Sequence, residues 1–173
     1  MTSSYRIADD PEPSREARFA VSTHWAFLAN VLGGSWIGLP WFVFNGHAVG
    51  SATRKEELRD AIASPLIALV VAFVAFGFID ALGVHPGPAA DRIADTLGLP
   101  DRAYAYAWVL IIAIKTFFAY RISWRQAKSV AIHESYGGKL MNGAALVAAA
   151  YFARSFVLAG AAKLSVYALV VVL

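Results

Sequence analysis

Residues 61–84, AIASPLIALVVAFVAFGFIDALGV, decide the fold class of this chain, because they form an apolar run with Asp80 as its only charged side chain. At a rise of about 1.5 Å per residue, about 20 apolar residues cross the hydrocarbon core of a bilayer. The run is continuous, whereas a strand of a membrane β-barrel would alternate apolar and polar side chains over about ten residues. The stretch therefore predicts a transmembrane helix.

The composition of the whole chain agrees with this prediction. Of the 173 residues, 58% are hydrophobic and only 16% are charged, with a formal net charge of +3. Intrinsic disorder is excluded, because it needs low hydrophobicity and high net charge. The chain has no cysteine, which excludes a disulfide framework and a cysteine metal site. We expect an all-α membrane protein, in which a polar N-terminal tail, 1–18, precedes a small polytopic helical bundle, 19–173. The bundle has about four hydrophobic segments, over residues 19–50, 61–85, 103–136 and 140–173.

The first and fourth segments leave their topology open. A Gly-Gly pair at 33–34 and Pro40 favour a re-entrant hairpin in the first segment. In contrast, Trp25 and Trp41 would lie about 24 Å apart in a helix, which suits the two interfacial anchors of a single span. On segment count we expect four spans. The fourth segment, 34 residues long, is too long for one upright span, so we expect it to tilt, to kink near Gly160 or to end in a second short element.

Basic residues indicate how the bundle lies in the membrane. Loop 51–60 holds three Lys or Arg residues, and loop 121–139 holds four, opposed by one acidic residue. Because Lys and Arg are retained on the cytoplasmic side, we expect both loops in the cytoplasm and a multi-pass protein of the inner membrane. With four spans the N-terminal tail would lie outside, and with a re-entrant first segment it would be cytoplasmic. Nucleic-acid binding has no support, since the basic residues are spread over membrane-flanking loops.

Four charged side chains lie inside the hydrophobic segments: Asp80, Lys115, Arg154 and Lys163. A charge at membrane depth is costly and is by default a functional hypothesis. By helical rise Asp80 and Arg154 reach similar depths, about 22 and about 18 Å, so we expect a structural ion pair between them. Lys115 would then extend toward the cytoplasmic face. The alternative is a site for an anion or an anionic lipid, lined by Lys115 and Arg154.

Two patterns predict contact surfaces. Arg121, Arg125 and Lys128 recur at i, i+4 and i+7 and so share one helix face, which favours contact with anionic lipid headgroups or a partner. Rows of small residues let helix backbones approach closely in lipid, and so predict helix packing within the bundle or between subunits. These rows are Gly34 and Gly38 in the first segment, and Ala145, Ala149 and Ala153 in the fourth.

No pattern in the sequence indicates catalysis. The chain has no Gly-x-Ser-x-Gly, no P-loop and no Gly-x-Gly-x-x-Gly, and Asp80 has no second intramembrane carboxylate for acid–base work. We expect no catalytic residues, no metal and no cofactor, but bound lipid. The leading hypothesis is a non-catalytic integral membrane subunit that packs into a homo-oligomer or a larger membrane complex, with lipids and other subunits or copies of itself as partners. The alternative is a small channel or carrier for an anionic solute or lipid.

Overall fold

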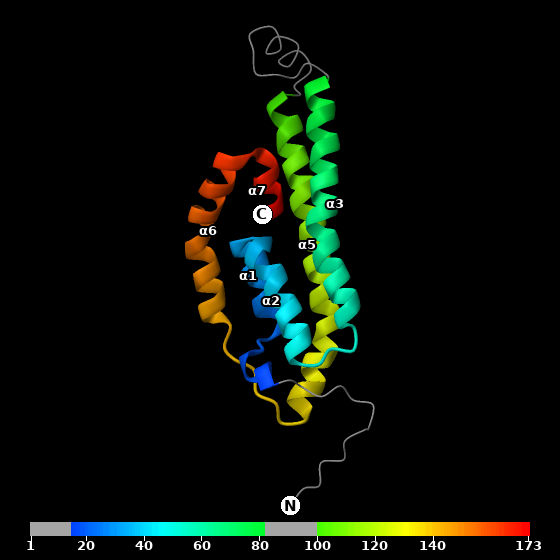
Figure 1. Ribbon diagram of the computed structural model, residues 1–173, viewed down its shortest axis with the longest axis vertical. Coiled ribbons are helices and arrows are strands. Elements are labelled where there is room, and N and C mark those ends of the chain that lie inside the picture. Colours follow the sequence, from blue (N-terminus) through cyan, green and yellow to red (C-terminus); the bar gives the residue numbers. More distant parts are fainter. Residues whose placement is uncertain (1–14, 82–99) are drawn as a thin grey trace, which may run out of the picture.

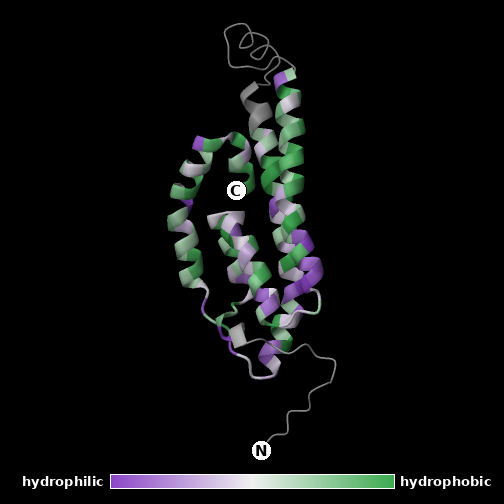
Figure 2. Cartoon of the chain, in the orientation of Figure 1, coloured by the Kyte–Doolittle hydropathy of each residue, from purple (hydrophilic) through white to green (hydrophobic). Residues whose placement is uncertain are grey.

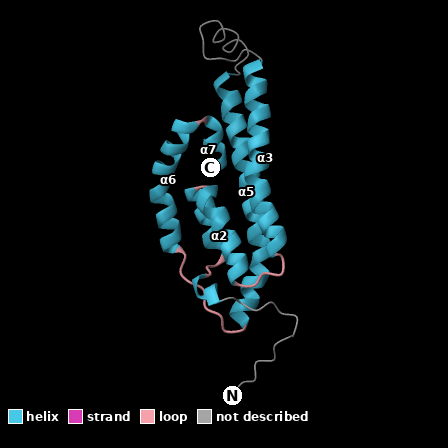
Figure 3. Cartoon of the chain, in the orientation of Figure 1, coloured by secondary structure: helices cyan, strands magenta, loops and turns pink. Residues whose placement is uncertain are grey.

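The computed structural model describes residues 15–81 and 100–173, and every regular element in these two ranges is a helix (Figure 1). Figure 3 shows these helices joined by short loops. In chain order they are the 3-10 helix η1 (Arg15–Phe19) and the α-helices α1 (Thr23–Gly33), α2 (Ser35–Ala48), α3 (Arg54–Ala81), α5 (Pro100–Ser135), α6 (Ala144–Leu164) and α7 (Val166–Val172). The prediction of a helical bundle is confirmed for this part of the chain. Most of the predicted tail, 1–14, lies outside the described residues.

Within the described ranges, three helices are long and apolar enough to cross a membrane: Arg54–Ala81, Ala105–Ser135 and Ala144–Leu164. The first two belong to α3 and α5, which lie side by side, and Figure 2 shows hydrophobic residues along much of their length. Ala68 and Ala72 of α3 are buried in one cluster with Ile111 of α5. Alanine at the contact lets two helices approach closely in lipid. The expected number of four spans is therefore wrong.

The first hydrophobic segment forms a hairpin of two short helices instead of a span. The helix α1 has 11 residues and α2 has 14, so they extend about 16 and about 21 Å, less than the roughly 30 Å of a hydrocarbon core. The chain reverses at Gly34, whose φ of 105° is a conformation that only glycine adopts easily. At Gly38 a Cβ would lie only 2.2 Å from the Cβ of Asn30, so the two arms are closely packed. The flexible glycines, and not the tryptophan anchors, decide this topology.

Both ends of the hairpin lie at the same end of the molecule (Figure 1). The side chain of Asn45 accepts a hydrogen bond from the Val21 amide at 2.9 Å and donates one to the Val21 carbonyl at 2.8 Å. The Met141 amide donates to the Ala20 carbonyl at 2.7 Å, which adds the connection between α5 and α6 to this end. The two basic stretches, 51–60 and 121–139, belong to this end as well, mostly as the first turns of α3 and the last turns of α5.

The fourth segment is divided at Ser165 and not at Gly160. Ser165 has an extended backbone, with φ −174° and ψ 164°, and its hydroxyl accepts a hydrogen bond from the Ala168 amide at 3.0 Å. This is the conformation and the contact of a helix N-cap. The helix α6 is thus one candidate span, and α7 turns back toward the hairpin (Figure 1). Of the three expected arrangements, a second short element is the one observed.

The hairpin lies between α6 on one side and the α3–α5 pair on the other. Its first arm, α1, packs on α6 and α5, and its second arm, α2, packs on α3 and α5. The short helix α7 packs on α3 and α6 and also contacts α2. The end of α1, the start of α2 and the end of α7 consequently meet inside the bundle.

Candidate functional site

The turn of the hairpin meets the end of α7. The backbone N–H and the hydroxyl of Ser35 both donate to the carbonyl oxygen of Leu173, at 2.9 and 3.2 Å. Gly34 lies so close to α7 that a Cβ there would be 2.8 Å from the carbonyl oxygen of Val172. The last carbonyls of a helix have no partner within that helix, and lipid offers none. The ends of α1 and α7 therefore need donors from elsewhere in the bundle.

Lys115 supplies such donors to α7. Its side chain comes from α5 and the residue is only 2% exposed. The ammonium nitrogen Nζ donates to the carbonyl oxygens of Val170 and Val171, at 2.6 and 3.1 Å. A cation at this position also favours the negative end of the helix dipole. Lys115 thus caps α7, and one of its three N–H groups remains for another acceptor.

Arg154 does the same for α1. It lies in the middle of α6, is half-buried, and its Nη1 donates to the carbonyl oxygen of Leu32 at 3.3 Å. Leu32 is the last residue but one of α1, so the guanidinium lies at the negative end of this helix. This contact uses one of the five N–H groups of the guanidinium. Both intramembrane cations therefore stabilise half-helices that end inside the bundle.

The two cations line one small cavity of about 70 Å³. Asn30 and Thr116 supply its other polar side chains, and no acidic side chain lines it in the described part of the chain. Asn30 is 4% exposed, and none of the described residues bonds its Oδ1 atom. A cavity of this size is larger than the roughly 30 Å³ share of one water molecule. The N–H groups of Lys115 and Arg154 suit a small anion or the carboxylate of a larger molecule, while Leu173 and the unbonded Oδ1 of Asn30 add acceptor oxygens to the lining.

The four predicted intramembrane charges thus separate into two groups. The structure brings Lys115 and Arg154 together, which is the alternative that the sequence left open. Asp80 lies exposed in the last turn of α3 and does not line the cavity, and Lys163 is exposed in the last turn of α6. The hairpin occupies the space between α6 and the α3–α5 pair, so Arg154 contacts α1 instead of forming the expected pair with Asp80.

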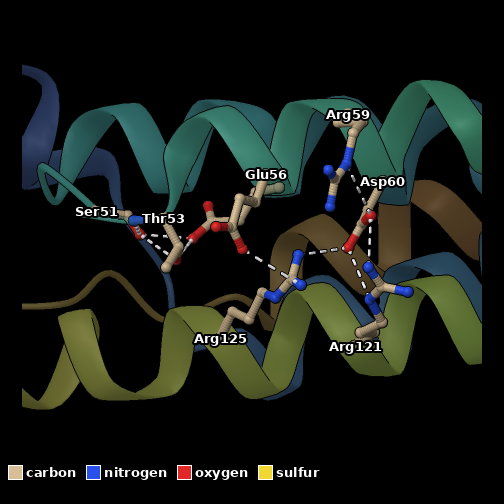
Figure 4. A network of polar contacts seen from close by, with 8 residues as sticks. Ser51, Thr53, Glu56, Arg59, Asp60, Arg121 and Arg125 are labelled. Carbon is tan, nitrogen blue, oxygen red and sulfur yellow. Dashed lines mark hydrogen bonds and ion pairs between the residues drawn. The ribbon is translucent and has the colours of Figure 1, made fainter.

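A second polar cluster joins α3 and α5 near their basic ends (Figure 4). Asp60 is 2% exposed and lies between two guanidinium groups. Arg121 approaches it at 3.0 Å and Arg125 at 2.7 Å, and Arg125 also contacts Glu56 at 3.3 Å. Two of the three residues predicted to contact anionic lipid thus form an ion-pair clamp within the chain. The third, Lys128, is exposed.

Glu57, a neighbour of this clamp, is not among the site residues predicted from the sequence. Glu57 is 1% exposed, and its carboxylate accepts hydrogen bonds from Ser51 at 2.5 Å, Thr53 at 2.6 Å and Gln126 at 2.7 Å. A Cβ on Gly46 of α2 would lie 2.2 Å from Glu57 Oε2, so this glycine makes room for the carboxylate. A signal was available in the spacing of charged residues. Glu57 and Asp60 are three apart and so share one face of α3, and Arg121 and Arg125 are four apart and share one face of α5. We assign the cluster a structural role, because its hydrogen bonds join α3, the loop before it and α5.

The rows of small residues are used differently from one another. Gly34 and Gly38 serve the turn and the inner contact of the hairpin. Where α1 meets α6, a Cβ on Gly33 would lie 2.3 Å from the Cβ of Ala150. The predicted row in α6 lies beside this seam, with Ala145 and Ala149 exposed and Ala153 half-buried.

Comparison with known proteins gave no match: no protein family, no curated protein and no solved structure is similar to this chain. Within the described residues, no group of three or more His, Cys, Asp or Glu side chains could hold a metal ion.

Proposed function

We propose that this chain is a small, non-catalytic integral membrane protein that binds an anion between its half-helices and carries it through the membrane. The observation that supports this proposal is the cavity itself. It brings together the buried Lys115 and the half-buried Arg154 at the point where three helix ends meet.

Two physical arguments favour carriage over a purely structural role. Helices that stop inside a membrane are tolerated where protein buries their ends or where they line a cavity, and transporters use such half-helices to build binding sites. Ionisable residues at this depth are rare and mark ion pathways. The cavity of about 70 Å³ suits one bound anion and not a water-filled pore, so we propose a carrier rather than an open channel.

Uptake of anions into proteoliposomes tests this function. We would measure radiolabelled chloride, sulfate, phosphate and succinate, none of which needs the protein to be identified beforehand. We expect at least one of them to enter faster than in protein-free liposomes. Arg154→Gln should slow this uptake at least tenfold, because it removes the positive charge and most of the N–H donors while leaving a polar side chain.

The matched control is Lys163→Met, which removes an exposed positive charge from the same helix. It should leave uptake within about twofold of the unaltered protein, since a solitary exposed charge contributes little. If Arg154→Gln and the unaltered protein carry every anion at the same rate, the cavity is not the transport site and the proposal is wrong.

We also propose that the end bearing both basic stretches faces the cytoplasm of a cell with an inner membrane. Lys and Arg flanking membrane spans are retained on that side. All the basic stretches lie at one end because the first segment is a hairpin, which puts η1 at this end too.

A second candidate function is the membrane subunit that assembles with copies of itself. The outward position of Ala145 and Ala149 on α6 favours it, because small residues on a lipid-facing helix allow close contact with another helix. The chain has no cysteine, so Ala149→Cys introduces a single thiol. A self-assembling protein should form disulfide-linked dimers through it, whereas Val74→Cys on the exposed face of α3 should not. Equal cross-linking of both variants would contradict an interface on α6.

A further inference from the structure

An apolar groove adjoins the cationic cavity on the outside of the bundle. The groove has a volume of about 540 Å³ and is lined by Phe27 of α1 and by one face of α5 from Val109 to Tyr120. Ile112 and Thr116 border both the groove and the cavity. The groove and the cavity are therefore adjacent.

The groove faces the lipid and is almost wholly apolar. Ile112, Phe117 and Tyr120 are each about half exposed, and they belong to a helix long enough to span the membrane. A pocket of a few hundred Å³ with apolar walls and a few polar groups at one place is the usual form of a small-molecule site. Here the polar groups are the two cations and the amide of Asn30.

The position of the cavity limits the size of the molecule that fits. Tyr120 is four residues beyond Thr116 and Val109 is three before Ile112, so the groove continues about 6 Å on one side of the cavity mouth and about 4.5 Å on the other. With carbon–carbon bonds of about 1.5 Å, about four bonds fit along the longer side, so that side holds an apolar body of about five carbons. A longer chain would extend beyond the groove into lipid.

We propose that the groove and the cavity form one site for a monocarboxylate with a single apolar body of about five to seven carbons, which reaches the site sideways from the membrane. This inference rests on the proposed function and names its ligand class. The planar carboxylate fits the fork of N–H groups on Arg154 and the free N–H of Lys115. The apolar body lies against Phe27 and α5. If the bound anion had no apolar body, lipid chains would fill the groove instead.

Photolabelling tests the location and the class of this ligand. The probe is octanoate with a diazirine at its far end, irradiated with the full chain in nanodiscs of phosphatidylcholine. We expect mass spectrometry to find the label at Phe27 or between Val109 and Tyr120. An excess of octanoate should suppress this labelling, whereas octanol, which lacks the carboxylate, and acetate, which lacks the body, should not.

Three variants sharpen the test. Arg154→Gln should reduce labelling of the groove at least tenfold, because it removes the charge that holds the carboxylate. Ala113→Trp should reduce it similarly, since Ala113 is exposed and its enlarged side chain would fill the groove. Ala148→Trp is the matched control, because Ala148 is also exposed but lies on α6 away from the groove, and labelling should stay within about twofold.

The results separate this inference from the proposed function. Label spread over the lipid-facing residues of α3 and α6, or suppressed equally by octanol, would overturn the monocarboxylate site even if inorganic anions are carried. Suppression by phosphatidylglycerol but not by octanoate would assign the groove to a two-chain lipid and would also overturn it. Labelling of the groove that depends on Arg154 supports the site, and the absence of any anion uptake would then contradict carriage alone.

Discussion

The ammonium nitrogen of Lys115 lies 2.6 Å from the carbonyl oxygen of Val170, a residue 55 positions further along the chain. The contact joins the middle of a candidate span to a half-helix that ends inside the bundle. It provides acceptors for the buried ammonium group and donors for the carbonyls at the helix end. Burying either group at this depth without the other would cost free energy. The arrangement explains why a lysine is retained in an otherwise apolar run.

Loss of this contact should destabilise the docking of α7. We expect Lys115→Met to lower the free energy of unfolding by about 1–3 kcal/mol, because two buried carbonyls lose their donor. Thermal unfolding in detergent micelles measures the change. Lys163→Met removes an exposed lysine and should shift stability by no more than about 0.5 kcal/mol. Equal effects of the two variants would show that the cap on α7 does not stabilise the fold.

The turn of the hairpin should not accept a side chain. Gly34 combines a φ of 105° with a close approach to Val172, so Gly34→Ala introduces both backbone strain and a clash. We expect a loss of about 1–3 kcal/mol in the same unfolding measurement. Gly160→Ala is the matched control, since Gly160 is helical and has open space where the Cβ would stand. It should be neutral or stabilising by up to about 1 kcal/mol, and a stable Gly34→Ala would contradict the observed turn.

The clamp between α3 and α5 should depend on its buried acid. Asp60→Asn leaves Arg121 without its counter-charge and Arg125 with only the exposed Glu56, and because both arginines are partly exposed we expect a moderate loss, about 1–3 kcal/mol. Arg59 also approaches Asp60, but at 3.9 Å and from an exposed position. Arg59→Gln should therefore change the unfolding free energy by less than about 0.5 kcal/mol. A similar loss for both variants would argue against a clamp made by the α5 arginines.

The hairpin topology predicts which residues share one side of the membrane. In cells expressing single-cysteine variants, Arg18→Cys and Ala52→Cys should either both be labelled by a membrane-impermeant maleimide or both escape labelling. The reason is that the two ends of the hairpin lie together. Ala81→Cys, at the other end of α3, should respond in the opposite way. A first segment that crossed the membrane would instead place Arg18 and Ala52 on opposite sides, and that result would restore four spans.

The class of this protein and most of its helices could be predicted from the order of its residues alone. Continuous apolar runs leave few alternatives to membrane helices, so the runs at 61–84 and 103–120 could be assigned to spans without a structure. The helical extension past Tyr120 was expected as well, whereas the short element at the end of the chain was one of three arrangements that the length of the fourth segment left open. Local signals conflicted in the first segment, where tryptophan spacing favoured a span and glycines favoured a turn.

Which charged side chains meet depends on how the helices pack in three dimensions. Helical rise gave each charge a depth but no direction, so Asp80 seemed the natural partner of Arg154. The hairpin then filled the space between α6 and the α3–α5 pair, and Arg154 met the carbonyl of Leu32 instead. Lys115 found its acceptors because the chain turns back at Ser165, fifty residues away. A cation inside the membrane is hydrogen-bonded by the acceptors that helix packing places next to it. The spacing of residues along its own helix does not predict that packing.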